Sequence, residues 1–145
     1  MPETSILFNN TSREILAVAG AMVAGEIAYR KKDFDGAFKH LQEAVRLDDA
    51  MNYDEPWAWM QPARHALGVL LAEQGRFADA EQVYRDDLHR HPKNPWALNG
   101  LAECLQEQGK TQEAVRVRQE FAAAMKRADV SIDRSCFCRL APVQR

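Results

Sequence analysis

The chain has 145 residues, a formal net charge of −2 and 46% apolar residues, which fits one ordinary globular unit with a sizeable core. The near-neutral charge argues against a basic nucleic-acid-binding surface, and the mixture of both signs suits solvated helix faces. The apolar stretch of residues 15–28 is too short and too glycine-rich for a membrane-spanning helix. Residues 1–10 lack a basic segment ahead of an apolar run, so we expect no secretory signal.

Three cysteines, two of them in Cys136-Phe137-Cys138, are too few for a disulfide framework. A reducing, cytoplasmic location is therefore the default expectation. The third, Cys104, lies between Leu101 and Leu105 on an apolar helix face, which predicts a buried small side chain.

The first helical signal in the chain is a capping box. Thr11 and Glu14 place a hydroxyl and a carboxylate three positions apart, so a helix is predicted over residues 12–31. Asp33 is a suitable cap for a second helix that ends near Asp48. The apolar positions of this second helix are Phe34, Ala37, Phe38, Leu41, Ala44, Val45 and Leu47.

An irregular segment with two tryptophans comes next. Residues 49–55 predict a loop, and Pro56 and Pro62 bracket the sequence WAWMQ. Because proline is tolerated only in the first turn of a helix, the next helix is predicted to start at Pro62, with a separate turn before it.

Residues 65–92 predict two amphipathic helices joined at Gly75, since glycine accepts the left-handed dihedrals that end a helix. Both helices keep the i, i+3, i+4, i+7 spacing of a buried face. The first apolar stripe contains Leu67, Leu70 and Leu71, and the second contains Phe77, Ala80, Val83, Tyr84 and Leu88.

A further pair follows the same plan. Asn94 and Pro95 predict a cap and a first turn, and Gly109 predicts the end of that helix. Thr111 then predicts the cap of a last helix that ends near Ala128. Helical spacing is absent after that residue.

The helix pairs recur with a fixed period. Gly75 and Gly109 are 34 positions apart, and so are Ala80 and Ala114. Ala37 and Ala80 are 43 positions apart, so the first linkage carries nine extra residues in the loop that precedes the second pair.

A period of about 34 residues with two helices per unit resembles the tetratricopeptide repeat family over roughly residues 18–128. The resemblance implies stacked helix pairs, in which small side chains permit a close crossing and large ones fill the gap to the next unit. The matching positions are Gly25, Gly68 and Ala102 in the first helices, Ala37, Ala80 and Ala114 in the second, Leu41, Tyr84 and Arg118 four residues later, and Pro92 at the close of the middle unit.

The chain departs from the family pattern at several positions. Ala21, Arg64 and Leu98 stand where the family has an early tryptophan. Asp87 replaces a usual small residue and Arg118 replaces an aromatic one.

Two segments resemble the C-terminal part of longer bacterial tetratricopeptide proteins that end in a Ser-Cys-Phe-Cys tail. These segments are YDEPWAWMQPARHALG and ADVSIDRSCFC. The resemblance implies that the chain is a fragment of such a protein, and it implies no established activity.

The family resemblance also implies an inner, concave face that is formed by the first helix of each pair and that generally binds peptides. By repeat register this face presents Met22, Glu26 and Tyr29, then His65, Val69 and Ala72, then Trp96, Asn99, Glu103 and Gln106. We predict a groove for an extended or helical segment of a partner, neutral or basic because Glu26 and Glu103 repel acidic groups. The alternative is an inner surface that is solvated or covered by the protein's own tail.

The insertion carries Tyr53, Trp57 and Trp59, a second candidate recognition patch, because aromatic anchors dominate interface energetics. The alternative, which we favour, is that Trp57 and Trp59 fold back to seal the junction between the first two units. A nine-residue insertion opens a gap that must be filled.

Cys136 and Cys138 are the third candidate site, since two thiolates one residue apart can bind copper(I) or zinc or undergo thiol exchange. A single pair is too few for a closed zinc site, and Arg134 and Arg139 would lower the thiol pKa values. The alternative, which we favour, is a mobile or packed tail with Phe137 docked on the last helix.

Together these patterns predict an all-α solenoid of three helix pairs, between an irregular leader that need not be ordered and a C-terminal tail. The pairs span residues 12–48, 56–91 and 95–128, the leader is 1–11, and the tail is 129–145. The predicted function is a protein–protein interaction or scaffold module without enzymatic activity, cofactor, nucleic acid or membrane partner. Two alternatives stay open: a thiol or metal-handling protein that uses the tail, and a structural part of a longer repeat protein that self-associates through the solenoid ends.

Overall fold

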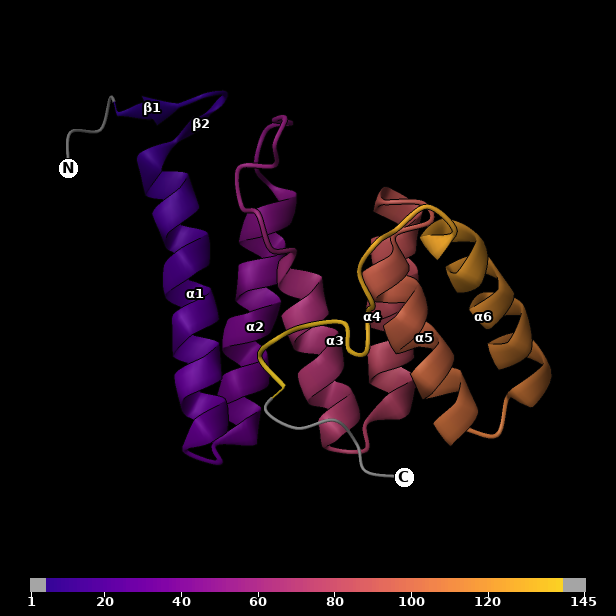
Figure 1. Ribbon diagram of the computed structural model, residues 1–145. Coiled ribbons are helices and arrows are strands. Elements are labelled where there is room, and N and C mark those ends of the chain that lie inside the picture. Colours follow the sequence, from indigo (N-terminus) through magenta and orange to yellow (C-terminus); the bar gives the residue numbers. More distant parts are fainter. Residues whose placement is uncertain (1–4, 140–145) are drawn as a thin grey trace. The chain divides into compact units, whose positions relative to one another are not determined.

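The computed structural model describes residues 5–139 and divides the chain into two compact units, Met1–Ala63 and Arg64–Arg145. The described part contains six helices and one small hairpin, which confirms the predicted all-α fold of helix pairs (Figure 1). No helix in residues 5–139 has the length and apolar character that a membrane crossing requires. The elements are β1 (Ile6–Leu7), β2 (Asn10–Thr11), α1 (Ser12–Arg30), α2 (Phe34–Asp49), α3 (Ala63–Glu73), α4 (Phe77–Arg90), α5 (Pro95–Glu107) and α6 (Thr111–Met125).

The first unit begins with a β hairpin in which β1 pairs antiparallel with β2. The side chain of Asn10 is buried and holds the hairpin against the loop after α2. Its amide nitrogen donates to the carbonyl oxygen of Asn52 at 3.0 Å and to the carboxylate of Asp54 at 2.7 Å. The sequence suggested an irregular leader, but these contacts hold the hairpin in place. Asn52 and Asp54 lie 42 and 44 positions after Asn10, so no local sequence pattern predicts the contacts.

The caps of α1 and α2 form as predicted. The hydroxyl oxygen of Thr11 accepts from the backbone N–H of Glu14 at 3.2 Å, and the Glu14 carboxylate accepts from the N–H of Thr11 at 2.7 Å. The Asp33 carboxylate accepts from the N–H of Gly36 at 3.0 Å. These side chains satisfy amides that the first turn of each helix leaves free.

The two helices of the first unit cross where the repeat register places a small residue. A Cβ atom added at Gly25 would lie 2.7 Å from Cγ of Leu41, closer than real side chains approach. The loop after α2 then leads to α3, which begins one residue after Pro62. The N–H of Ala63 donates to the Asp48 carboxylate at 3.1 Å, so the end of α2 caps the start of α3.

The second unit is organised around the buried ring of Tyr84 in α4. A Cβ atom added at Gly68 in α3 would lie 2.7 Å from Cζ of this ring, and one added at Gly100 in α5 would lie closer still. The ring therefore fills the space between the first helices of two successive pairs. The repeat pattern assigned large residues such as Tyr84 to the gap before the next unit, and Gly68 and Gly100 are the two small positions that the ring meets there.

The turn inside each pair uses the left-handed backbone conformation. Gly75 and Gly109 end α3 and α5 with φ of 72° and 73°, as the sequence predicted. In the first pair this conformation belongs to Lys32, with φ of 65°. The turn geometry is thus retained where the glycine is not.

A network of charged side chains ties α4 to the turn between α5 and α6. The Glu81 carboxylate accepts from Nζ of Lys110 at 2.7 Å, from Nε2 of Gln108 at 2.6 Å and from Nε of Arg85 at 2.9 Å. Arg85 also pairs with Glu113 in α6 at 2.5 Å. Because Glu81 is nearly buried, its charge depends on these donors.

This network predicts a loss of stability in acid. Burial alone would raise the pKa of Glu81, but the hydrogen bonds from Lys110, Arg85 and Gln108 outweigh it and lower the pKa below 4.5. A lowered folded-state pKa contributes stability above the unfolded-state value, and that stability is lost as pH falls through the folded value.

We therefore expect the free energy of unfolding, measured by urea denaturation from about pH 6 to pH 3, to fall less steeply in Glu81→Gln than in the unmodified protein. Glu120→Gln removes an equal charge from an exposed position of α6 and should leave the slope unchanged. Equal slopes in all three proteins would show that the network contributes nothing to acid sensitivity.

Candidate functional site

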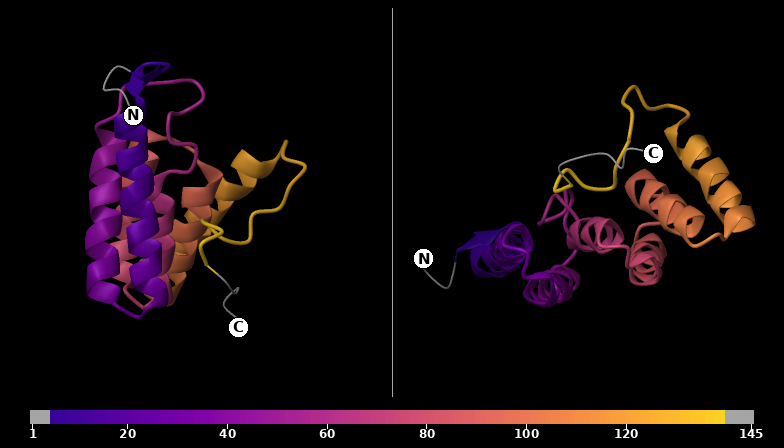
Figure 2. Two further views of the ribbon diagram at one scale, coloured as in Figure 1. Left: turned by 90° about the vertical axis from the view of Figure 1, so that its left-hand side faces the viewer. Right: turned by 90° about the horizontal axis from the view of Figure 1, so that it is seen from below.

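The segment after α6 turns back and runs along the second unit (Figures 1 and 2). We name residues 133–139 the tail segment. Three of its side chains contact three helix side chains of the same unit. The contacts are Ser135 with Tyr84, Phe137 with Trp96, and Arg139 with Glu103.

The strongest of these contacts is the ion pair between Arg139 and Glu103 of α5. One terminal nitrogen of the guanidinium donates to both carboxylate oxygens, at 3.0 and 3.2 Å. Only 4% of Arg139 is exposed. A buried charge must be paired to be tolerated, so the position of this arginine depends on Glu103.

The second contact joins the hydroxyl groups of Ser135 and Tyr84, both of which are buried. Burial raises the pKa of Tyr84 far above its ordinary value, so the phenol keeps its proton. Since each hydroxyl can donate or accept, this hydrogen bond satisfies two polar groups that lie away from water.

The third contact is an edge-to-face arrangement of Phe137 and Trp96, with ring centroids 5.7 Å apart. The Phe137 side chain is 74% exposed, so it lies at the margin of the contact. We expected Phe137 to dock on the last helix; its ring partner is instead the first turn of α5, because the tail turns back past that helix.

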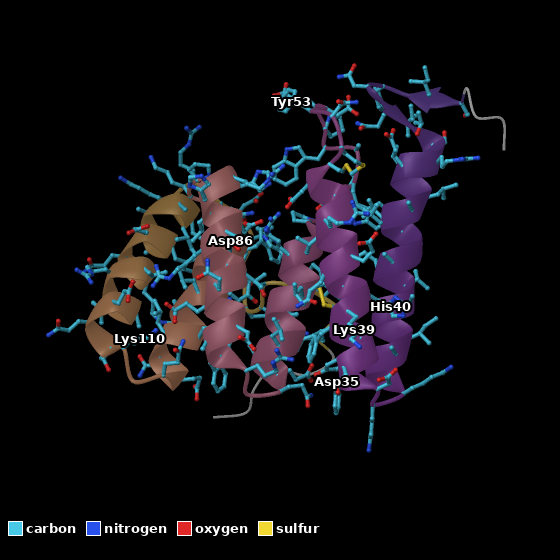
Figure 3. The ribbon with its side chains drawn as sticks, turned by 180° about the vertical axis from the view of Figure 1, so that it is seen from behind. Asp35, Lys39, His40, Tyr53, Asp86 and Lys110 are labelled. Atoms are coloured by element: carbon cyan, nitrogen blue, oxygen red, sulfur yellow. A yellow bond between two sulfur atoms is a disulfide. The ribbon has the colours of Figure 1, made fainter. Side chains whose placement is uncertain are left out.

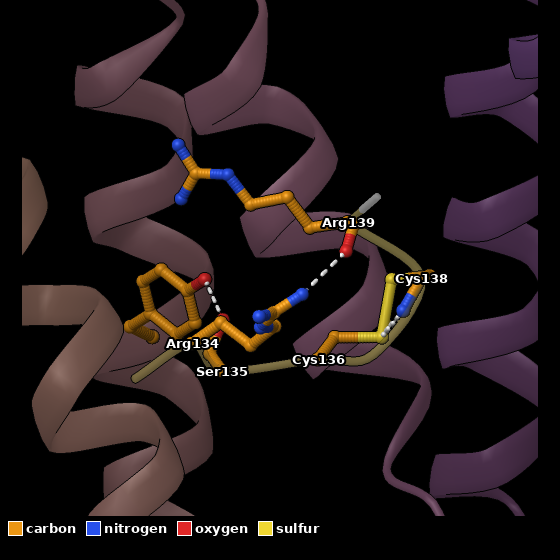
Figure 4. The surroundings of a disulfide bond; sticks show 6 residues. Arg134, Ser135, Cys136, Cys138 and Arg139 are labelled. Atoms are coloured by element: carbon orange, nitrogen blue, oxygen red, sulfur yellow. Dashed lines mark hydrogen bonds between the residues drawn. A yellow bond between two sulfur atoms is a disulfide. The ribbon is translucent and has the colours of Figure 1, made fainter. Parts of the chain in front are cut away.

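Cys136 and Cys138 form a disulfide between the two polar anchors of the tail segment (Figure 4). The N–H of Cys138 donates to Sγ of Cys136 at 3.2 Å. Arg134 closes the turn by donating to the carbonyl oxygen of Arg139 at 3.0 Å. The described residues contain no group of three or more His, Cys, Asp or Glu side chains placed to hold a metal ion.

The guanidinium groups that were expected to lower the thiol pKa values have other partners. Arg134 pairs with Asp133 at 3.0 Å, and Arg139 pairs with Glu103. In the disulfide neither sulfur atom carries a titratable thiol, so the expected effect on thiol pKa values does not arise in this state.

The predicted groove residues of α5 lie where the tail segment runs. Glu103 and Trp96 contact it directly, Asn99 is half-buried, and Gln106 is exposed. The structure therefore realises the alternative of an inner face covered by the protein's own tail, in the part of that face that α5 provides.

The predicted groove residues of α3 are not accessible. His65 is 4% exposed and Val69 is also buried. Nε2 of His65 lies 3.1 Å from the Asp87 carboxylate, and the Asn94 amide donates to that carboxylate at 3.2 Å. Asp87 is therefore the partner of His65, which gives a physical reason for a carboxylate at a position where the family pattern has a small residue.

In the first unit, Tyr29 is a core residue and not a groove residue. It is 6% exposed, and its ring packs edge-on against Phe34 at 5.2 Å and Phe38 at 6.2 Å. Of the other two residues that the register assigned to this face in α1, Met22 is buried and Glu26 is half-buried. Most of the groove residues that the register assigned to α1 and α3 are therefore buried.

The aromatic residues of the insertion differ in exposure. Tyr53 projects from the tip of the loop (Figure 3), and Trp57 is 41% exposed. Trp59 is half-buried, and within residues 5–139 its buried Nε1 has no hydrogen-bond partner. Tyr53 is thus the most exposed of the three aromatic side chains.

A separate hollow of about 440 Å³ lies among α4, α5 and α6. Leu88, Leu98 and Val117 contribute apolar surface to it, but the Arg85 guanidinium at its margin is already bound to Glu113. None of the predicted site residues lines this hollow, so the tail contacts define the candidate site.

Comparison with known proteins supports the repeat architecture. Residues 71–120, from the end of α3 into α6, match the family model described as Tetratricopeptide repeat. Over 91 residues the chain is 38% identical to "Cellulose synthase operon protein C" of Pseudomonas fluorescens (strain SBW25). The aligned region is 63% of this chain but 7% of that relative, so the chain spans a small part of the relative's length.

Proposed function

We propose that the chain is a protein–protein interaction module that binds an extended peptide segment on the α5 side of its second unit. The observation that supports this most directly is the tail segment itself. It occupies that surface through an ion pair, a hydroxyl hydrogen bond and an aromatic contact. Glu103, Tyr84 and Trp96 therefore have the geometry to hold a non-helical segment.

The chemistry of this surface favours a basic partner. Glu103 is the carboxylate that receives Arg139, and an arginine of a partner would make the same paired hydrogen bonds. An acidic segment would be repelled by the same group. Tyr84 adds a hydroxyl that suits serine or threonine, and Trp96 adds a ring face or edge for an aromatic residue.

Helical repeats that stack in pairs present extended surfaces for partner proteins, and this supports an interaction role over a catalytic one. The likeness to Cellulose synthase operon protein C makes proteins encoded in cellulose synthase operons the first partners to screen.

A peptide array tests this proposal. The full chain carrying Arg139→Ala should bind arginine-containing peptides, because the substitution removes the ion pair that the tail makes with Glu103. Adding Glu103→Lys should lower that binding by on the order of tenfold and shift the preference to acidic peptides.

Glu120→Lys is the matched control, since it makes the same change of charge at an exposed position of α6, outside the three tail contacts described above. Its array profile should equal that of Arg139→Ala alone. A Glu103→Lys profile that also equals it would refute binding on this surface.

A further inference from the structure

We propose that Cys136 and Cys138 are a thiol–disulfide switch that keeps the tail segment on the α5 surface when oxidised and releases it when reduced. The inference rests on the proposed function, because the switch controls access to the same surface. The α5 surface binds the tail segment, and a dithiol reductant supplies the electrons that open the disulfide.

The disulfide lies between the two polar anchors of the tail. Ser135 directly precedes it, and Arg139 directly follows it. By closing the chain between Cys136 and Cys138, the bond fixes the turn that directs one anchor to Tyr84 and the other to Glu103 (Figure 4). The two anchors then engage as one ligand.

Reduction separates the anchors. The free tail gains conformational freedom that binding must remove again, and a cross-link acts by taking that freedom away beforehand. As the tail is tethered, its effective concentration at the surface is on the order of millimolar, which an outside peptide must overcome. Weaker binding of the tail segment to the α5 surface therefore raises the apparent affinity of that surface for a partner, although the surface itself is unchanged.

The exposure of the two sulfur-bearing residues sets the direction of the reaction. Cys136 is buried and Cys138 is half-buried, so a thiolate of the reductant attacks Sγ of Cys138. The S–S bond breaks, and its electron pair passes to Sγ of Cys136, which accepts the hydrogen bond from the Cys138 N–H. The second thiol of the reductant then displaces Sγ of Cys138. Two electrons and two protons have passed to the protein, and the reductant leaves as its own disulfide.

The third cysteine does not interfere with this reaction. Cys104 is fully buried in α5, and burial raises the pKa of its thiol to about 12. Thiolates are the reactive form, so this residue stays inert near neutral pH. In a reducing cytoplasm the tail would be released, and in an oxidising compartment it would stay on α5.

The test measures binding of a fluorescent peptide that copies residues 133–139 with serine at both cysteine positions. Four forms of the full chain are compared: oxidised, reduced with dithiothreitol, Cys136→Ser/Cys138→Ser, and the open control Ser135→Ala/Phe137→Ala/Arg139→Ala. The open control keeps every helix residue of the surface and removes the three side-chain contacts that Ser135, Phe137 and Arg139 make with it. We expect the reduced and double-serine forms to bind the peptide at least about tenfold more tightly than the oxidised form.

Equal affinities in the oxidised, reduced and double-serine forms overturn the switch. If the open control then binds the peptide, and the open control that also carries Glu103→Lys does not, the proposed function stands without the switch. If the open control fails to bind any array peptide, the proposed function falls as well. Far-UV circular dichroism, which should be the same in all four forms, separates loss of binding from loss of fold.

Discussion

Replacing Gly68 by leucine is expected to lower the free energy of unfolding of the second unit by about 3 kcal/mol. The first added carbon would already lie 2.7 Å from Cζ of Tyr84, and the ring is held on its other side by Gly100. It also hydrogen-bonds Ser135 through its hydroxyl, so it has no free direction in which to move. The cost must appear as a displaced ring or as separated helices.

The matched control is the same substitution at Gly20 in α1. A Cβ atom there would meet nothing within 4 Å, so Gly20→Leu should be neutral or slightly stabilising, since leucine is the better helix former. Chemical denaturation of both variants provides the comparison. A Gly68→Leu protein as stable as Gly20→Leu would show that the assigned repeat register is wrong.

Replacing Asp87 by alanine is expected to destabilise the second unit by about 2–4 kcal/mol. The carboxylate is 1% exposed and has two partners, the buried Nε2 of His65 and the amide of the half-buried Asn94. Its removal leaves both polar groups without this acceptor inside the protein. Burying an unsatisfied donor costs more than the original hydrogen bond contributed.

Asp86→Ala is the control, because it removes the same side chain one position earlier. Asp86 is exposed on α4 (Figure 3), where its carboxylate accepts a hydrogen bond from the Gln82 amide of the same helix at 2.8 Å. Its substitution should change the unfolding free energy by no more than about 0.5 kcal/mol. Similar losses in the two variants, measured by thermal and urea denaturation, would rule out a special role for the His65–Asp87 pair.

The repeat register predicted part of the candidate site. Spacing placed Glu103 and Trp96 on the inner helix of the third pair, and both contact the tail segment. The same spacing placed Tyr29 and His65 on that face, where both are buried. The repeat register predicts on which face of its helix a side chain lies. It does not predict which other segments of the protein pack against that face.

The contacts that hold the β hairpin against the loop after α2 cannot be predicted from the sequence for a related reason. Asparagine in a leader is typical of turns and loops, and Asn10 carries no local sign of burial. Its partners Asn52 and Asp54 lie in the loop after α2, 42 and 44 positions further along the chain. Two polar segments that satisfy each other have no apolar periodicity for a sequence pattern to detect.

By itself the sequence determined the helices, their caps at Thr11 and Asp33, the glycine stops at Gly75 and Gly109, and the period that pairs them. These follow from interactions within a few residues, such as side-chain capping, backbone dihedral preference and amphipathic spacing. Tertiary structure alone decided the rest. The Arg139–Glu103 pair joins residues 36 positions apart and the Ser135–Tyr84 contact joins residues 51 apart. Such pairs depend on where an irregular tail comes to lie, and the packed helices offer it the half-buried carboxylate of Glu103 and the buried hydroxyl of Tyr84.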